Sequence, residues 1–233
     1  MEQEPLWPTG PGPFVWVNCA CSLDGRLAYA GGARARLSSP EDLVRVQRLR
    51  AGADGILVGV GTVVKDDPSL RVHWELLGKT SGPNPTRIVA DGSGRTPEGA
   101  RVLDSSAPTI IATTERSRRR FPPHVRTLVA GAERVDLARL FERLPGLGIR
   151  RLMVEGGAEI LATVVRAGLF DRLTVYYAPV VIGGTTAPAM ISGPETRGPA
   201  DVASCILADI ARVGEGYVAT YLPRRTSARV GPE

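Results

Sequence analysis

Short apolar runs recur along the chain, and most of them end in glycine or in a lone polar residue. The first run, FVWVNCACS at residues 14–22, has the β-branched and aromatic character of a strand. Similar runs occupy residues 55–62, 87–91, 109–113, 126–130, 150–155 and 172–181. Several are continuously apolar, which is typical of strands that are covered on both faces of a parallel sheet. Residues 214–222 alternate instead, and this pattern predicts a final antiparallel strand.

Helix signals separate these runs. In SSPEDLVRVQRLRAG, Ser39 suits the N-cap, Pro40 suits the first helical position, and Gly52 ends the segment. A second helix is indicated at residues 135–148, and a third runs from the glycine pair at 156–157 to about residue 168. Strands that alternate with helices predict an α/β fold. We expect a mainly parallel sheet with helices on both faces and a C-terminal antiparallel strand.

The apolar runs continue from residue 14 to residue 222 without an intervening linker or an internal repeat. This continuity predicts one domain over residues 14–222. The Pro- and Gly-rich segment 1–13 and the segment 223–233 are expected to be flexible tails.

Composition narrows the class of protein. The 233 residues are 43% hydrophobic and 23% charged, as in soluble globular proteins, and no apolar stretch is long enough for a membrane span. The N-terminus has acids and prolines where a signal peptide has bases and an apolar run, so we expect a cytoplasmic protein without a membrane partner. Three cysteines and two histidines, with no C-x-x-C spacing, predict no metal site.

The net charge of +5 is compatible with nucleic acid or with small phosphorylated ligands. The densest basic cluster, residues 116–120, contains no aromatic residue that would stack on a base. Such runs are usually solvated faces, and we therefore expect no nucleic-acid partner.

The stretch LMVEGGAEI, residues 152–160, places two glycines between a strand and a helix. Free N–H groups and the helix dipole favour an anion there, and glycine lets a phosphate approach the backbone. A tight turn required only for packing is an equally good interpretation. The spacing does not match the dinucleotide-binding fingerprint of a Rossmann fold.

Three further loops follow predicted strands: SLDGRLA at 22–28, VGVGTVVKDDPSL at 58–70 and ADGSGRTP at 90–97. Thr62 and Asp66 would face the same way on a helical turn and could hold a ribose or an amide, although a capped turn explains them as well. Arg95 is a candidate for a phosphate, and Asp24 fits a plain hairpin turn. Ligands of open α/β sheets bind at this edge, so the pattern predicts a phosphate-bearing ligand but no particular reaction.

Taken together, the motifs resemble those of the reductases of riboflavin biosynthesis. SLDGRLA, RVQRLRAGADGILVGVGTVVKDDPSLRVH, NPTRIVADGSGR, TIIATTE and LMVEGGAEIL occur in the same order, over about residues 14–222. The resemblance implies a dihydrofolate-reductase-like fold and a homodimer. It also implies NADPH-dependent reduction of the ribosylamino side chain of a pyrimidinone 5′-phosphate to ribitylamino. A deaminase segment is absent, as in the stand-alone archaeal and fungal form, which acts on 2,5-diamino-6-(ribosylamino)-4(3H)-pyrimidinone 5′-phosphate.

The resemblance also implies roles for individual residues. The cofactor-binding set, with the pyrophosphate at residues 156–158, is Ala20, Gly61, Thr62, Asp66, Asp91, Ser93, Arg95, Thr113, Gly156, Gly157 and Ala158. The substrate-binding set, in which Arg50 grips the phosphate, is Asn18, Arg36, Arg50, Leu70, His73 and Glu155. Asp24 and Glu155 are the candidate catalytic groups, with water as the alternative proton donor.

Three positions depart from the bacterial fused relatives. Asn18 stands where those relatives often have Lys, Arg36 where they have Trp, and His73 where some have Arg. Asn18 is the usual choice in archaeal-type enzymes and favours the earlier-acting substrate, whereas Arg36 is either a phosphate contact or a surface residue. A dihydrofolate reductase acting on a pterin and a non-catalytic nucleotide-binding module are the alternative functions.

Overall fold

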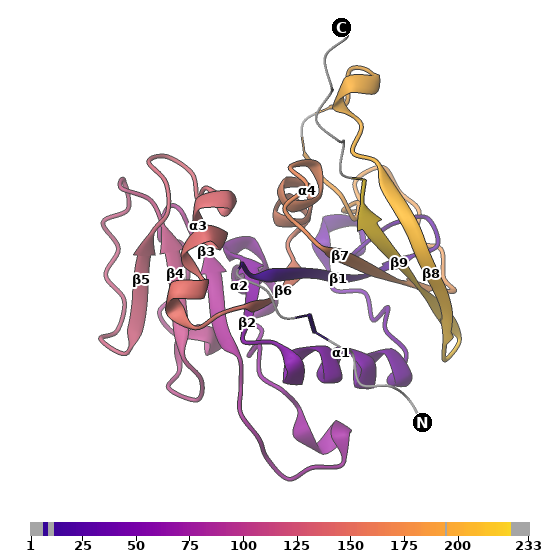
Figure 1. The fold of residues 1–233 in the computed structure, drawn as a ribbon. Coiled ribbons are helices and arrows are strands. Elements are labelled where there is room, and N and C mark those ends of the chain that lie inside the picture. Colours follow the sequence, from indigo (N-terminus) through magenta and orange to yellow (C-terminus); the bar gives the residue numbers. More distant parts are fainter. Residues whose placement is uncertain (1–6, 9–11, 194, 225–233) are drawn as a thin grey trace, which may run out of the picture.

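A computed structural model describes residues 7–8, 12–193 and 195–224 as one twisted sheet with helices on both faces (Figure 1). The strand order is β5-β4-β3-β2-β6-β1-β7-β9-β8, and every neighbouring pair is parallel except β7–β9 and β9–β8. The strands are β1 Phe14–Ser22, β2 Gly55–Gly59, β3 Thr86–Ala90, β4 Thr109–Thr113, β5 Val125–Val129, β6 Arg151–Gly156, β7 Arg172–Ala178, β8 Cys205–Val213 and β9 Gly216–Pro223. The mainly parallel sheet predicted from the apolar runs is confirmed.

Helices close both faces of the parallel part of the sheet. Below it in Figure 1 lies α1 (Pro40–Gly52), and on that face α2 (Val60–Asp66) packs with α1 over Trp16 and Met153. On the other face, α3 (Leu137–Arg143) and α4 (Ala158–Arg166) cover Val17 and Leu152. Every residue of β2 and β4 is buried, which is why these strands read as unbroken apolar runs. No helix in the described part of the chain is both long and apolar enough to cross a membrane.

Two predicted boundaries were wrong. The run at residues 55–62 is a strand only to Gly59, and α2 then begins at Val60. A Cβ at Gly59 would lie 2.9 Å from Ile160 Cγ1, so the chain turns at the point where it meets α4. Only Val60 and Val63 of α2 are buried, too few to show a helical period. The run at residues 172–181 ends as a strand at Ala178.

The C-terminal antiparallel strand is confirmed as β9, and it is preceded by a strand that the sequence pattern does not predict. All nine residues of β8 are at least partly exposed. Without a buried face, its side chains need not alternate between apolar and polar, so the period-2 signal is missing. A tight turn joins Val213 of β8 to Gly216 of β9.

Most of the residues predicted to form flexible tails lie outside the described part of the chain, namely residues 1–6, 9–11 and 225–233. Within the first segment, the Trp7 side chain is buried, and its ring lies 5.1 Å from that of Trp16 and 6.0 Å from that of Phe14. Trp7 therefore belongs to the core on the α1 face.

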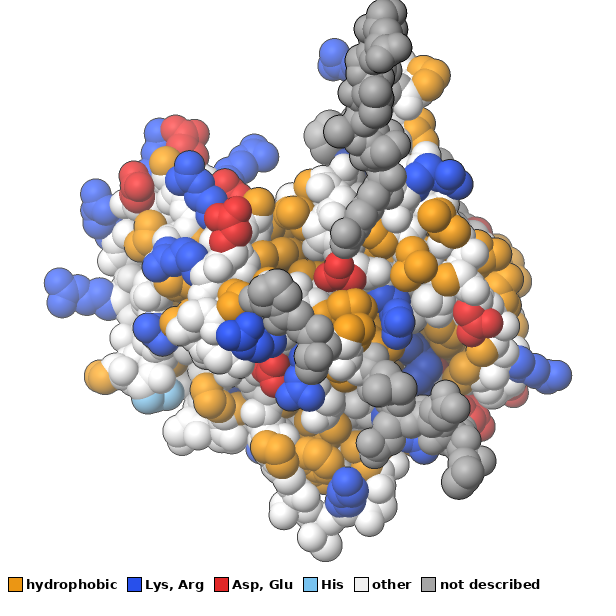
Figure 2. Space-filling view, viewed as in Figure 1, with side chains coloured by type: hydrophobic (Ala, Val, Ile, Leu, Met, Phe, Trp, Pro, Cys, Tyr) orange, Lys and Arg blue, Asp and Glu red, His pale blue; other side chains and the backbone are white. Residues whose placement is uncertain are grey.

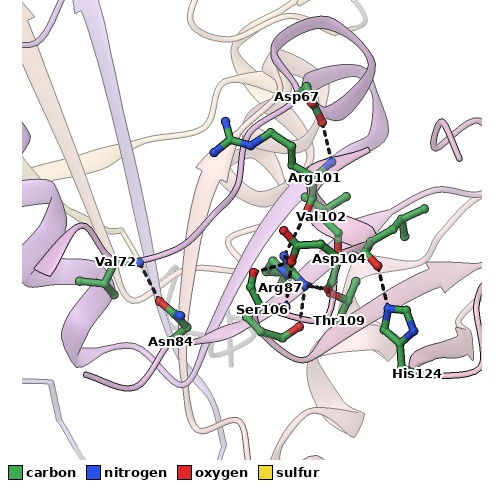
Figure 3. Close-up of polar contacts among 12 residues, drawn as sticks. Asp67, Val72, Asn84, Arg87, Arg101, Val102, Asp104, Ser106, Thr109 and His124 are labelled. Atoms are coloured by element: carbon green, nitrogen blue, oxygen red, sulfur yellow. Dashed lines mark hydrogen bonds and ion pairs between the residues drawn. The ribbon is translucent and has the colours of Figure 1, made fainter. Parts of the chain in front are cut away.

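A buried arginine anchors the connection between β3 and β4 (Figure 3). Arg87 is fully buried and donates to Thr109 Oγ1 at 2.9 Å, to Asp104 Oδ1 at 2.8 Å and to the carbonyl of Arg101 at 2.9 Å. Burial would raise the pKa of Asp104, but hydrogen bonds from Ser106 and Arg87 hold it at about 2. These contacts fix a loop that reaches the end of α2, where Asp67 accepts a hydrogen bond from the backbone N–H of Arg101.

Candidate functional site

A cavity of about 1060 Å³ opens at the edge where the parallel strands end. Ala20 near the end of β1, Gly59 of β2, Ala90 of β3 and Gly156 of β6 all line it. Parallel strands present their carboxyl ends at one edge, so segments far apart in the sequence meet here. The volume reaches the upper end of the range of ligand pockets.

One wall of the cavity, hereafter the glycine side, is made by residues 156–158, 61–62 and 93–95. Gly156 and Gly157 have φ values of 138° and 81°, a region that favours glycine. A Cβ at Gly156 would meet no atom within 4 Å, so the backbone is open to a ligand. The next residues begin α4, where the first N–H groups have no intrahelical partner. This wall fits an anionic group that approaches the backbone closely.

The loop after β3 is shaped by a buried carboxylate. Asp91 accepts hydrogen bonds from the backbone N–H groups of Arg95 and Thr96, at 2.9 and 2.8 Å, and from Thr96 Oγ1 at 2.7 Å. Ser93 and Arg95 line the cavity, whereas Asp91 lies behind them. Thr113 is also set back, and its buried hydroxyl has no hydrogen-bond partner among the described residues. The structure therefore separates residues that can touch a ligand from residues that hold the loop.

Cations and carboxylates both surround the glycine side, and the acidic lining residues there are Asp66, Glu133 and Glu159. The basic lining residues are Arg34, Lys65, Arg95, Arg134 and Arg166. No salt bridge among the described residues engages the first four of them. Apart from Arg95, the sequence patterns did not single out these residues. The rule that ligands bind beyond the strand ends would have flagged Arg134, which follows β5.

A second group of residues, hereafter the arginine side, consists of Asn18, Arg45, Arg50 and Glu155, and it reaches the cavity through Glu155. Arg50 Nε and Nη2 each lie 2.6 Å from a different Glu155 oxygen, and Arg50 Nη1 donates to the carbonyl of Arg71 over 2.9 Å. Burial disfavours the charge of Arg50, but attraction to Glu155 outweighs it and raises the pKa of Arg50. The contact of Arg50 with a substrate phosphate stays a prediction. In the structure, its guanidinium holds Glu155.

A β-bulge explains how an acid comes to precede the glycines. Leu57 pairs with Val154 and the next residue, Val58, pairs with Gly156, so Glu155 is the extra residue in β6. A bulge re-aims the side chain that it carries. Glu155 consequently lines the cavity while Arg50 holds both of its oxygens.

The other predicted substrate residues lie beside or behind this pair. Leu70 is buried at φ 51°, a conformation rare for leucine, and this bend precedes the Arg71 carbonyl that meets Arg50. The backbone N–H of His73 donates to Gln47 Oε1 of α1. Neither side chain lines the cavity, nor does the exposed side chain of Arg36.

Asp24 holds a loop rather than facing the cavity. Its carboxylate accepts from Ser22 Oγ at 2.7 Å and from the N–H groups of Ile182 and Gly183 at 3.0 and 2.8 Å. The hydrogen bond from Ser22, together with those from the loop, lowers the pKa of Asp24 to about 2. A carboxyl group that stays ionised near neutral pH is a poor proton donor. The loop that it fastens carries Pro188 into the lining of the cavity.

Of the predicted cofactor set, the structure brings most members to the cavity wall: Ala20, Gly61, Thr62, Asp66, Ser93, Arg95, Gly156, Gly157 and Ala158. Of the predicted substrate set, only Glu155 lines it directly. Asn18 follows Val17, which pairs with Val154, the residue before Glu155.

The chain is similar to known proteins over most of its length. It is 39% identical to a protein of Archaeoglobus fulgidus named 2,5-diamino-6-ribosylamino-4(3H)-pyrimidinone 5′-phosphate reductase, and the match covers 89% of this chain and 97% of that protein. The solved structure of the Saccharomyces cerevisiae riboflavin biosynthesis reductase Rib7 has a TM-score of 0.71 at 25% identity, covering 94% and 93% of the two chains.

A deaminase/reductase structure from Thermotoga maritima has a TM-score of 0.78 at 23% identity, which shows the fold alone. This chain spans 57% of the length of that protein. The likeness confirms the expected dihydrofolate-reductase-like fold. A family model described as the RibD C-terminal domain matches residues 13–219, and the chain therefore belongs to that family.

Proposed function

We propose that this chain is an NADPH-dependent reductase that converts the ribosylamino side chain of a pyrimidinone 5′-phosphate to ribitylamino in riboflavin biosynthesis. The archaeal relative is named for the diamino substrate, and we propose the same substrate here. The observation that carries the proposal is the junction of two unlike groups of residues at one cavity. Open backbone at Gly156 adjoins the fixed carboxylate of Glu155.

The glycine side fits a dinucleotide. Gly156 and Gly157 let a pyrophosphate reach the N–H groups at the start of α4, and Thr62 and Asp66 offer polar groups to the neighbouring sugar or amide. Arg95 and Ser93 are exposed lining residues suited to the 2′-phosphate that distinguishes NADPH from NADH. When bound, the nicotinamide supplies the hydride for the reduction.

The arginine side binds and orients the substrate. Glu155 can accept a hydrogen bond from an N–H or O–H group of the substrate, and Arg50 prevents the carboxylate from swinging away. Arg50 is also the proposed partner of the 5′-phosphate, and the exposed Arg36 is a second candidate. The low pKa of Asp24 leaves water as the proposed source of the proton.

The test is the loss of absorbance at 340 nm when purified protein is mixed with the diamino substrate and NADPH. We expect turnover with NADPH, a slower rate with NADH and a slower rate with the deaminated pyrimidine. Dihydrofolate serves as the control for the pterin alternative. No oxidation of NADPH with either pyrimidine would contradict the proposal, and so would faster turnover of dihydrofolate.

We further propose that two copies of the chain associate through β8. Hydrophobic side chains gather over β8 and β9 on the right of Figure 2, and Ile206, Leu207 and Ile210 are 44%, 52% and 58% exposed. An uncovered edge strand with an apolar surface is a ready partner for a second strand. Sedimentation should show a dimer that Ile210→Lys dissociates. The matched control Val129→Lys, on the opposite edge strand β5, should remain dimeric, and a monomeric wild type would overturn the proposal.

A further inference from the structure

The Asn18 side chain takes part in a series of hydrogen bonds whose direction is set by the donors. Trp16 Nε1 donates to Thr174 Oγ1 over 3.0 Å, and Thr174 Oγ1 lies 2.9 Å from Asn18 Oδ1. Arg45 Nη2 donates to the same Asn18 oxygen over 2.8 Å. An indole N–H can only donate, so the Thr174 hydroxyl accepts from Trp16 and donates to Asn18 Oδ1 at 2.9 Å, which is nearer than the carbonyl of Val17 at 3.4 Å. Two donors converge on Oδ1, and the NH₂ group of Asn18 is turned away from both.

Arg45 is itself held in place by a buried acid. Its Nε lies 2.8 Å and its Nη2 2.7 Å from Asp42 Oδ1, three residues earlier in α1. The Asp42 side chain is fully buried, and Ser39 Oγ accepts the backbone N–H of Asp42 at the helix start. A buried carboxylate strongly favours keeping its cation, so the direction of Arg45 is fixed.

Asn18 follows Val17, which pairs with Val154, and Glu155 is the next residue of β6. Ala20, two residues further on and on the same face of β1, lines the cavity. None of the hydrogen bonds found in the described part of the chain uses the Asn18 amide nitrogen. Its two N–H donors are therefore available to a ligand.

We propose that Arg45 is a positioning residue that makes Asn18 a pure donor toward the substrate. This inference rests on the proposed reductase function. By occupying Oδ1, Arg45 leaves only N–H groups for the ligand, while the ionised Glu155 of the neighbouring strand offers only acceptors. The two side chains together match an acceptor next to a donor, as the C=O and N–H of a lactam edge present them. The pyrimidinone ring carries such an edge.

The first test is Arg45→Met, which removes the donor and frees the amide to rotate. We expect the KM for the diamino substrate to rise about tenfold, the value of one lost hydrogen bond, with kcat and NADPH affinity within about twofold of wild type. Arg45→Lys keeps a cation between Asp42 and Asn18 and should recover most of the KM. Arg139→Met, which removes an exposed Asp–Arg pair of the same i, i+3 spacing on α3, should leave KM unchanged. A folded Arg45→Met protein with the wild-type KM would overturn the inference.

A second variant tests the direction of the amide. Asn18→Asp keeps an oxygen for Arg45 but replaces the NH₂ group by an acceptor. Its KM should rise at least as much as that of Arg45→Met, while its thermal midpoint stays at or above that of wild type. Wild-type substrate binding in Asn18→Asp would overturn the donor assignment.

Failure of the proposed function is distinguishable from failure of this inference. If wild type turns over no pyrimidine, the reductase proposal fails. The thermal midpoints still report on the amide. Asn18→Asp should be more stable than Asn18→Leu, which leaves Arg45 without its oxygen. Equal midpoints would overturn the orientation.

Discussion

The glycine side and the arginine side meet at one cavity, which the arginine side reaches through Glu155, and the two are built by different means. On the glycine side, backbone groups and exposed cations are accessible to a ligand. A Cβ atom at Gly156 would have no neighbour within 4 Å. On the arginine side, each charged group already has its partner, as Arg50 has Glu155 and Arg45 has Asp42. A ligand with its own negative charge needs only an open, positive wall. A substrate that must be oriented for reaction needs side chains that are fixed before it arrives.

The comparison predicts that the arginine side contributes to stability and the glycine side does not. The largest effect should come from Arg50→Met, which leaves the partly buried carboxylate of Glu155 without its cation. Breaking such a pair costs about 3–5 kcal/mol, measurable by urea denaturation. The double variant Arg50→Met with Glu155→Leu should recover much of the stability but no turnover. If the single variant is as stable as wild type, the pair does not support the fold.

The next largest effect should be on cofactor binding through Gly156→Val. A branched side chain at φ 138° is strained, and it would project into the space assigned to the pyrophosphate. We expect NADPH affinity, followed by fluorescence titration, to fall at least about 100-fold, or about 2.7 kcal/mol. Gly99→Val is the matched control, since Gly99 has an open Cβ position and ordinary φ but does not line the cavity. Retained affinity in a folded Gly156→Val protein would remove the pyrophosphate assignment.

Arg95→Ala should weaken cofactor binding less than Gly156→Val does. Loss of one exposed contact to the 2′-phosphate should weaken NADPH binding about tenfold, or about 1.4 kcal/mol, and leave NADH binding unchanged. The unfolding free energy should not change, because Arg95 forms no salt bridge among the described residues. Parallel titrations with both cofactors provide the measurement, and equal losses for the two would make Arg95 a general contact.

The smallest effect concerns the loop that Asp24 holds. The pKa of Asp24 is lowered to about 2 in the folded protein, whereas it is about 3.9 in an unfolded chain. The ionised Asp24 therefore contributes to stability above about pH 3.9. That contribution disappears as the pH falls through about 2. Asp24→Asn should therefore show a flatter decline of unfolding free energy between pH 4 and pH 2 than wild type. Its turnover at neutral pH should stay within a few-fold, whereas loss of all activity would restore Asp24 as a catalytic candidate.

Much of the fold was predictable because its strands are buried on both faces. Burial on both faces demands continuous apolar runs, and β2, β4 and β6 show them plainly. The capping residues Ser39 and Asp136 mark the starts of α1 and α3, since each accepts a hydrogen bond from the first turn. Few residues of β8 and α2 are buried, so their sequences show no period of hydrophobic residues. These two elements were therefore not predicted.

The glycine side was likewise predictable from the sequence, because it depends on local chemistry at strand ends. Gly156 and Gly157 need φ values that other residues avoid, and their place between a strand and a helix is visible without the fold. The arginine side was decided by the tertiary structure alone. Arg50 and Glu155 are 105 residues apart, and Arg45 and Asn18 are 27 apart. Only the packing of α1 near β1 and β6 shows that Arg45 meets Asn18 and that Arg50 meets Glu155, because these contacts join residues that are far apart in the sequence.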